Sequence, residues 1–168
     1  MKIRLFAALT ATLLATGAHA ELVFKDDTGH EVRLREPARR IIALAPHIAE
    51  SLYAAGAGSR MVGTVDYSDY PPAAKQLPRV GGYSRIDLEA VVALKPDLVI
   101  AWESGNNMVQ ADKLRALGLT VYISQPNRME DVAAQLERYG QLAGTSAVAS
   151  AEARRFRERL AALQTANA

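Results

Sequence analysis

The feature that most constrains this chain is a repeated alternation between short apolar segments and amphipathic ones. Four segments are almost wholly apolar and short enough to be buried strands: RRIIALAP (39–46), MVGTVDY (61–67), DLVIA (97–101) and TVYIS (120–124). Helical patterns lie between and after them, in HIAESLYAAGAG (47–58), LEAVVALK (88–95), MVQADKLRALG (108–118) and MEDVAAQLERYGQLAG (129–144). Apolar strands that alternate with helices are typical of a parallel sheet covered by helices on both faces. The alternation therefore predicts an α/β fold.

The ends and buried faces of these helices follow from the same pattern. Asp87 is placed to cap the helix over 88–95, and Pro96 ends it. Gly118 stops the helix that precedes it. The residues expected on apolar faces are Ile48, Leu52 and Tyr53 in the first helix, Val109, Leu114 and Leu117 in the third, and Met129, Val132, Leu136 and Tyr139 in the fourth.

Outside the alternating strands and helices, the pattern predicts a hairpin before the first strand and a further helix near the end of the sequence. LVFKDDTGHEVRL (22–34) alternates apolar and polar residues around Thr28-Gly29, which predicts a β-hairpin. From Ala149 onward the chain is helical by propensity, with Phe156, Leu160 and Leu163 as a narrow apolar seam among arginines and glutamates. A helix so basic on most sides is expected on the outside of a domain or between two domains.

Residues 1–20 have the pattern of a secretory signal peptide. Two basic residues precede an apolar run over 5–15, and Ala18-His19-Ala20 forms a cleavage site of small residues. The run of about 11 residues is too short to cross a bilayer, which takes ~20. The mature chain is therefore expected to start at Glu21 and to reside outside the cytoplasm.

Composition excludes several classes of function. The chain contains no cysteine, which rules out disulfides, thiol catalysis and cysteine-ligated metal centres. Its formal net charge of +2 gives no indication of a nucleic-acid partner. With 49% hydrophobic residues and about 148 residues after cleavage, the chain is large enough for one hydrophobic core.

Three aromatic residues are expected at one edge of the sheet. In an open parallel α/β sheet, ligands bind outside the carboxyl ends of the strands. Trp102, the single tryptophan, directly follows the third strand, Tyr67 follows the second, and Tyr83 lies in the loop VGGYSR (80–85). Three rings at this edge would form a flat, partly wet apolar surface that suits a large planar ligand. The alternative is that each ring only closes the end of the core.

The same region offers little to a catalytic mechanism. The chain has neither the phosphate-binding motif G-x-x-x-x-G-K nor the serine elbow G-x-S-x-G. His47, Asp66 and Ser68 could be combined into a small secreted hydrolase, which stays as an alternative from another class. His47 is instead expected to cap, or to hydrogen-bond at, the start of its helix. A lone His47 with scattered carboxylates predicts no zinc or iron site, and no catalytic residue is assigned.

Three segments of the chain resemble a family of substrate-binding proteins. LAPHIAESLYAAGAG (44–58), VDYSDYPPAAKQLPRVGGYSRIDLEAVVALKPDLVIAWESGN (65–106) and ALGLTVYIS (116–124) are similar to the iron-siderophore, haem and cobalamin group of periplasmic proteins that serve ABC importers. The tract DLEAVVALKPDLVIAW marks the broad group. YSDYPP, together with the tryptophan after VIA, points to the cobalamin (vitamin B12) branch. The resemblance covers about residues 22–160.

The resemblance implies a bilobal architecture, in which one long helix joins two α/β lobes and the ligand lies between them. Residues 21–149 would form the N-terminal ligand-binding lobe. Residues 150–168 would start the connecting helix, and a second lobe of comparable size is not part of this sequence.

The resemblance also implies roles for four residues. Tyr67, Tyr83 and Trp102 match ligand contacts of the family, and Glu89 matches an acidic residue that is presented to arginines of the membrane permease. Glu89 also falls in the first helical turn after Asp87, where the helix dipole favours a negative charge, so a purely local role is its alternative. The residue matching Tyr83 is often tryptophan in the family. A tyrosine keeps the stacking face and adds a hydroxyl that could coordinate haem iron.

These inferences together predict a non-enzymatic, monomeric protein of the periplasm that captures cobalamin and delivers it to the permease of an ABC importer in the inner membrane. Haem or a ferric siderophore is the alternative ligand within the same family. No cofactor and no nucleic-acid partner are expected.

Overall fold

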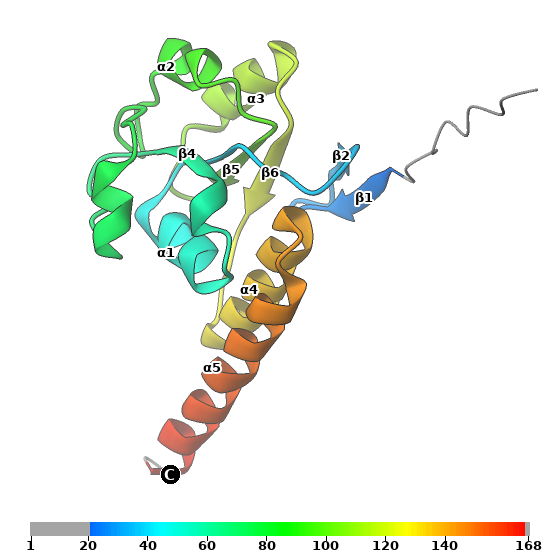
Figure 1. Cartoon of the computed structure of the whole chain (residues 1–168), viewed down its shortest axis with the longest axis vertical. Helices are drawn as coiled ribbons and strands as arrows, with labels where there is room; N and C mark the ends of the chain where they lie inside the picture. The colour runs from blue at the N-terminus through cyan, green and yellow to red at the C-terminus, as the bar shows by residue number, and fades with distance from the viewer. Residues whose placement is uncertain (1–20, 167–168) are drawn as a thin grey trace, which may run out of the picture.

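A four-stranded parallel sheet forms the centre of the molecule (Figure 1). The computed structural model describes residues 21–166, so the predicted signal peptide over 1–20 lies outside the described residues. The strands are β3 (Ile41–Ala43), β4 (Met61–Thr64), β5 (Leu98–Trp102) and β6 (Val121–Ser124), in the spatial order β4-β3-β5-β6. All neighbouring pairs in this sheet are parallel, which confirms the predicted α/β fold.

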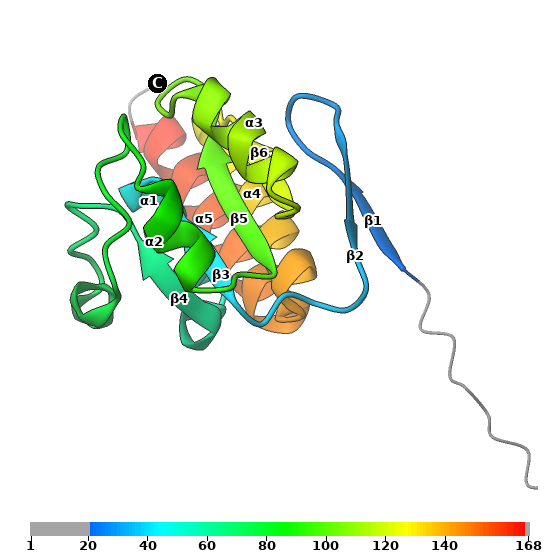
Figure 2. The same cartoon turned by 90° about the horizontal axis from the view of Figure 1, so that it is seen from above.

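Helices cover both faces of the sheet (Figure 2). α1 (Pro46–Ala54), α4 (Met129–Ala143) and α5 (Ser146–Ala166) lie on one face, and α2 (Leu88–Ala93) and α3 (Met108–Ala116) lie on the other. Because side chains alternate along a strand, Ile41 packs in the core beneath α1 and α4, whereas Ile42 packs beneath α2 and α3. Two short 3-10 helices, η1 (Gly58–Arg60) and η2 (Pro72–Gln76), precede and follow β4.

Side-chain caps fix the starts of two helices on the α2–α3 face. Asp87 accepts a hydrogen bond from the backbone N–H of Ala90 at 3.0 Å, which confirms the predicted cap of α2. Asn107 caps α3 in the same way, through the N–H of Val109 at 3.0 Å. Gly118 takes a φ of +85° after α3, a conformation that glycine adopts without strain, so it stops the helix as predicted.

Three apolar residues that the pattern assigned to buried helix faces are exposed instead. Val109 is 63% exposed, Leu117 60% and Met129 58%. α3 directs Ala111 and Leu114 into the core. Val109 lies about 140° around the helix from Leu114, at 100° per residue, and Leu117 lies beyond the last turn. Met129 is the first residue of α4 and precedes the turns that pack on the sheet. These three assignments were therefore wrong, while the other residues expected on apolar faces are buried or half-buried.

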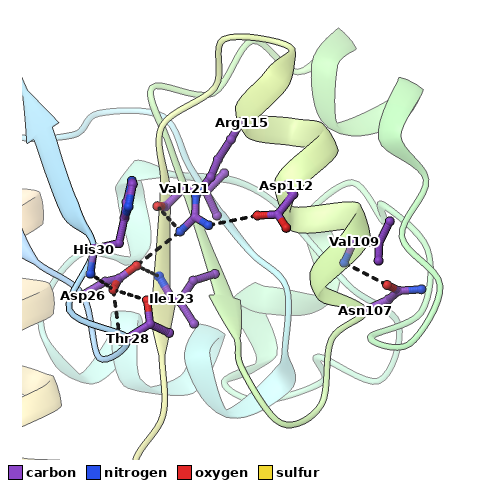
Figure 3. A network of polar contacts seen from close by, with 9 residues as sticks. All are labelled: Asp26, Thr28, His30, Asn107, Val109, Asp112, Arg115, Val121 and Ile123. Atoms are coloured by element: carbon purple, nitrogen blue, oxygen red, sulfur yellow. Dashed lines mark hydrogen bonds and ion pairs between the residues drawn. The ribbon is translucent and has the colours of Figure 1, made fainter.

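The predicted hairpin forms at the N-terminal end, from β1 (Leu22–Lys25) and the antiparallel β2 (Glu31–Leu34). The fully buried side chain of Asp26 fixes its turn (Figure 3). One carboxylate oxygen accepts hydrogen bonds from Thr28 and from the backbone N–H of His30, at 2.7–3.0 Å. The other lies 3.3 Å from both the backbone N of Ile123 and the guanidinium of Arg115. The hairpin is therefore joined to the outer edge of β6.

The last two helices lie side by side and continue past the sheet (Figure 1). A Cβ atom at Gly140 of α4 would stand 2.2 Å from the Cβ of Ala149, so the glycine allows α5 to pack closely. Arg157 of α5 also makes two hydrogen bonds to Glu137, at 2.8 and 2.9 Å. α5 starts earlier than expected, and the predicted boundary at 149/150 falls inside this one helix; the division into lobe and connecting helix stays a prediction. Within residues 21–166, no helix has both the length and the apolar content that crossing a membrane requires.

Candidate functional site

The candidate site lies at the carboxyl ends of β3 and β5, in the middle of the sheet. From β3 the chain passes through α1 to β4 on one side, and from β5 it passes through α3 to β6 on the other. Where neighbouring strands send their connections in opposite directions, a space opens between the loops, and ligands bind there in open α/β sheets. His47, Trp102 and the turn over 103–106 are located at this point.

Trp102 is the last residue of β5, whereas the sequence pattern had placed it just after the strand. Its backbone lies in register with Ser124 of β6, and its indole is half-buried. The ring centroid lies 5.0 Å from that of His47, with an angle of 84° between the planes, which is an edge-to-face contact. Gly105 lies against the indole so closely that an added Cβ would stand 1.8 Å from its Cε3 atom. The position of this ring is therefore set by the sheet, His47 and Gly105 together.

His47 is in the first turn of α1 but does not cap the helix. Ala45 occupies the N-cap position and no side chain makes a capping hydrogen bond, so the predicted capping role was wrong. Nε2 of His47 is buried and has no hydrogen-bond partner within the described residues. Burial lowers the pKa of the imidazole, which favours the neutral ring. A neutral His47 therefore packs against the indole of Trp102.

The structure brings two of the three predicted aromatic residues together. The ring of Tyr83 lies 6.5 Å from that of Trp102 with the planes tilted by 45°, and Tyr83 is 45% exposed. Tyr67 is 80% exposed in the loop after β4, and no ring contact joins it to either of the others in residues 21–166. Its φ of +63° is unusual for an aromatic residue. The pair of Tyr83 and Trp102 is called the aromatic pair below.

The residues that could have formed a hydrolase are not arranged for catalysis. Ser68 is fully buried, and its hydroxyl accepts a hydrogen bond from the hydroxyl of Thr64 at 2.8 Å. His47 makes no hydrogen bond through Nε2 and faces Trp102. Asp66 is exposed, with its carboxylate near Gly82. A nucleophile and a base within hydrogen-bonding reach are the minimum for this chemistry, and these residues do not provide them.

Asn106 was not among the predicted site residues, but it lies at the centre of the site. Its side chain is buried and forms hydrogen bonds with backbone atoms of Leu44, Tyr83 and Trp102. The surrounding sequence, ESGNN, reads as an exposed polar loop. The one available signal was the position of this amide directly beyond a strand at the expected ligand edge.

Glu89 makes no hydrogen bond or ion pair with the aromatic pair in residues 21–166. It is exposed in the first turn of α2, and its carboxylate has no hydrogen-bond or ion-pair partner within residues 21–166. It borders a shallow hollow of about 530 Å³ that is also lined by Arg85 and Gln110. Among the described residues, no group of three or more histidine, aspartate or glutamate side chains is placed to hold a metal ion.

Comparisons with known proteins show chains that this one resembles. The vitamin B12-binding protein of Vibrio cholerae is 44% identical over 129 residues, which are 77% of this chain and 47% of that protein. Its counterpart in Yersinia pestis is 37% identical over 129 residues, 77% of this chain and 46% of that protein. The crystal structure of the periplasmic vitamin B12 binding protein of Vibrio cholerae superposes with a TM-score of 0.74, over 77% of this chain and 51% of that chain.

A second solved structure shares the fold at lower identity. It is the periplasmic heme-binding protein of Pseudomonas aeruginosa, with a TM-score of 0.68, 29% identity, and coverage of 73% of this chain and 44% of that chain. This chain thus spans about half the length of the relatives it matches. The family model described as "Periplasmic binding protein" matches residues 41–168, more than half of the sequence. The chain belongs to the periplasmic binding protein family.

Proposed function

We propose that this chain captures cobalamin in the periplasm and supplies it to the permease of an ABC importer. The observation that carries the proposal is the aromatic pair at the switch point of the sheet, with its rings 6.5 Å apart. Cobalamin is a large, nearly planar macrocycle with amide groups at its edge, and aromatic faces with polar tips suit such a ligand. The vitamin B12-binding proteins among the relatives support the same assignment.

Each of the three aromatic residues would contribute to ligand binding in a different way. Trp102 is held by the sheet and provides a rigid face, which lowers the entropy lost on binding. Tyr83 is half-exposed beside it and extends the surface, and Tyr67 extends it toward β4. A non-glycine residue at positive φ costs ~1–3 kcal/mol, and such strain is found most often at functional sites. The φ of +63° at Tyr67 therefore supports a role for this residue in the ligand surface.

A transport role also accounts for the absence of a catalytic arrangement around His47. We infer that the chain carries no enzymatic activity. We also infer that the mature form starts at Glu21 and that it acts as a monomer. The hydrolase alternative has no observation in its favour, because Ser68 is buried and is not bonded to His47.

Haem is the second candidate ligand. The hydroxyl of Tyr83 has no hydrogen-bond partner in residues 21–166, and its side chain is 45% exposed, so it is free to approach a haem iron. The heme-binding protein of Pseudomonas aeruginosa, which shares the fold at 29% identity, supports this candidate. Cobalamin is favoured over haem because the relatives with 37–44% identity are named for vitamin B12.

An optical titration separates the two candidates. Cobalamin and hemin have different visible bands, and each absorbs strongly enough to quench Trp102, the single tryptophan. Saturable quenching by cyanocobalamin, with a shift of its visible bands and a weaker response to hemin, supports the proposal. Trp102→Phe keeps an aromatic face but removes the tryptophan emission, so its binding is measured from the visible bands alone and should persist. If the wild-type chain responds to hemin and not to cyanocobalamin, the haem candidate replaces the proposal.

We further infer that Glu89 contributes to docking on the permease. Its carboxylate is exposed in the first turn of α2 and is unpaired within the described residues. A free carboxylate at the surface suits an arginine of a partner protein, because guanidinium and carboxylate groups pair with two parallel hydrogen bonds. The ligand and the permease would then use separate surfaces.

A further inference from the structure

One buried amide connects the three loops of the candidate site. Asn106 is 7% exposed. Its Oδ1 accepts a hydrogen bond from the backbone N–H of Trp102 at 2.6 Å, and its Nδ2 donates to the backbone carbonyls of Leu44 at 2.8 Å and Tyr83 at 2.5 Å. The backbone N–H of Asn106 also donates to the carbonyl of Trp102 at 2.9 Å. Residues that are 62 and 23 positions away in sequence thus meet at one side chain.

The three partners require an asparagine at this position. A backbone N–H can only donate and a carbonyl can only accept, so they fix which end of the amide is oxygen and which is nitrogen. An aspartate accepts from Trp102 but has no N–H for the two carbonyls. An aliphatic residue of similar size leaves all three backbone groups without this partner, which is most costly for the buried carbonyl of Leu44.

The bond to Tyr83 is especially informative. It is the single hydrogen bond that Tyr83 makes within residues 21–166, through either its backbone or its hydroxyl. The ring is 45% exposed, so apolar burial cannot define its position tightly. Hydrogen bonds of Gly81 and Gly82 hold the loop on one side of Tyr83, and the contact from Asn106 ties the residue itself to the backbone of Trp102 and Leu44.

We propose that Asn106 is the positioning residue of the ligand surface: it sets the separation and tilt of Tyr83 and Trp102 relative to the end of β3. The effect of Asn106 on the two rings is inferred from the hydrogen bonds alone. Its effect on ligand binding also rests on the proposed function. Asn106 does not touch the ligand; it holds the backbone from which both contacting rings project.

The test of positioning uses the ligand-free chain. Near-ultraviolet circular dichroism of Trp102 reports its coupling to Tyr83, and Tyr83→Leu removes that coupling. In the wild-type background, Tyr83→Leu is expected to change the tryptophan band. In the Asn106→Asp background, the same Tyr83→Leu change is expected to have little effect, because the two rings are already apart. Equal effects of Tyr83→Leu in both backgrounds would overturn the positioning role.

The test of binding uses cyanocobalamin titrations at several pH values. Asn106→Asp is expected to weaken binding about tenfold at neutral pH, which is the contribution of one aromatic contact. Protonation of the new carboxyl at lower pH provides one O–H donor, so part of the affinity should return. Protonation also removes the stability cost of a buried carboxylate, so affinities are compared only at pH values where circular dichroism shows that the variant is fully folded. Wild-type affinity for Asn106→Asp at neutral pH would overturn the link to binding.

Asn107→Asp is the matched control, with the same change of charge at the neighbouring position. Asn107 caps α3 through Oδ1, and aspartate caps equally well, so both the circular dichroism band and the affinity should stay at wild-type values. If Asn106→Asp does not fold, Asn106→Ser supplies a smaller polar group and the same double-variant comparison with Tyr83→Leu decides the outcome. If the wild-type chain does not bind cyanocobalamin, the proposed function is refuted. The ligand-free test of Asn106 is not affected by that result.

Discussion

Gly105 is the position where one added methyl group tests the geometry of the site most directly. The Cβ of an alanine there would lie 1.8, 2.1 and 2.5 Å from the Cε3, Cζ3 and Cδ2 atoms of Trp102. Carbon atoms that are not bonded pack at ~3.5–4.0 Å, so the six-membered ring of the indole would have to move by about 1.7 Å. The backbone of Trp102 is held by β6 and Asn106, so we expect the side chain to rotate.

Two magnitudes follow from that displacement. Overpacking of this kind typically costs ~1–3 kcal/mol of stability, and each kcal/mol lowers the melting temperature of a chain this size by roughly 2–4 °C. The indole would also leave the edge of His47 and its half-buried position, which should shift its fluorescence emission to longer wavelength. Loss of one properly placed aromatic face should weaken cyanocobalamin binding by about 1 kcal/mol.

Thermal unfolding, the emission spectrum and a cyanocobalamin titration measure these effects in one set of samples. Gly82→Ala is the matched control, because its Cβ would meet only the Asp66 carboxylate, at an ordinary 3.8 Å. That variant should keep the emission and affinity of the wild type. If Gly105→Ala behaves like Gly82→Ala in all three measurements, the indole does not lie against Gly105 and the described site is incorrect.

Three further variants test other parts of the molecule. Trp102→Ala should lower the free energy of unfolding by less than the ~3–5 kcal/mol that truncation of a core aromatic residue costs, which denaturation measures. It should also weaken cyanocobalamin binding by about 1 kcal/mol, which titration of the same sample measures. Glu89→Arg should reduce cobalamin uptake by cells at unchanged ligand affinity, and a loss of affinity would contradict the docking role. Burial lowers the pKa of His47, so the unfolded chain binds a proton at higher pH than the native chain. The free energy of unfolding should therefore fall as pH drops from about 6.5 toward the lowered pKa of His47 in the native chain. His47→Asn should flatten that part of the stability–pH curve.

Local chemistry made most of the fold predictable. The strands β3 to β6 coincide with the four apolar runs, and the hairpin, the Asp87 cap and the Gly118 stop form where the residues placed them. Each of these features depends on neighbours within a few positions of the chain, which is the range that periodicity and capping signals cover. Helix faces were less predictable, as Val109 and Leu117 show, because Val109 lies on another side of α3 from the buried Leu114 and Leu117 follows its last turn.

The arrangement of the site depends on contacts that periodicity does not encode. Strand order decides which loops meet, and β3 pairs with β5 even though β4 lies between them in sequence. That pairing brings His47 to Trp102 and leaves Tyr67 at a separate place on the edge. Asn106 was missed for the same reason, since the residues that make its amide necessary are 62 and 23 positions away.

Asn106 and Asp26 show how this molecule holds loops that apolar packing cannot hold. Both side chains are buried, and both hydrogen-bond backbone groups of segments far away in sequence: Asp26 joins the hairpin to Ile123, and Asn106 joins Leu44, Tyr83 and Trp102. A ligand surface must leave its rings exposed, so burial of those rings cannot supply the energy that orders them. Directional bonds to the backbone order a loop without covering its side chains. The polar residue that holds the backbone of an exposed aromatic pair is therefore as much a part of a binding surface as the rings. Its substitution should lower ligand affinity even though its side chain does not contact the ligand.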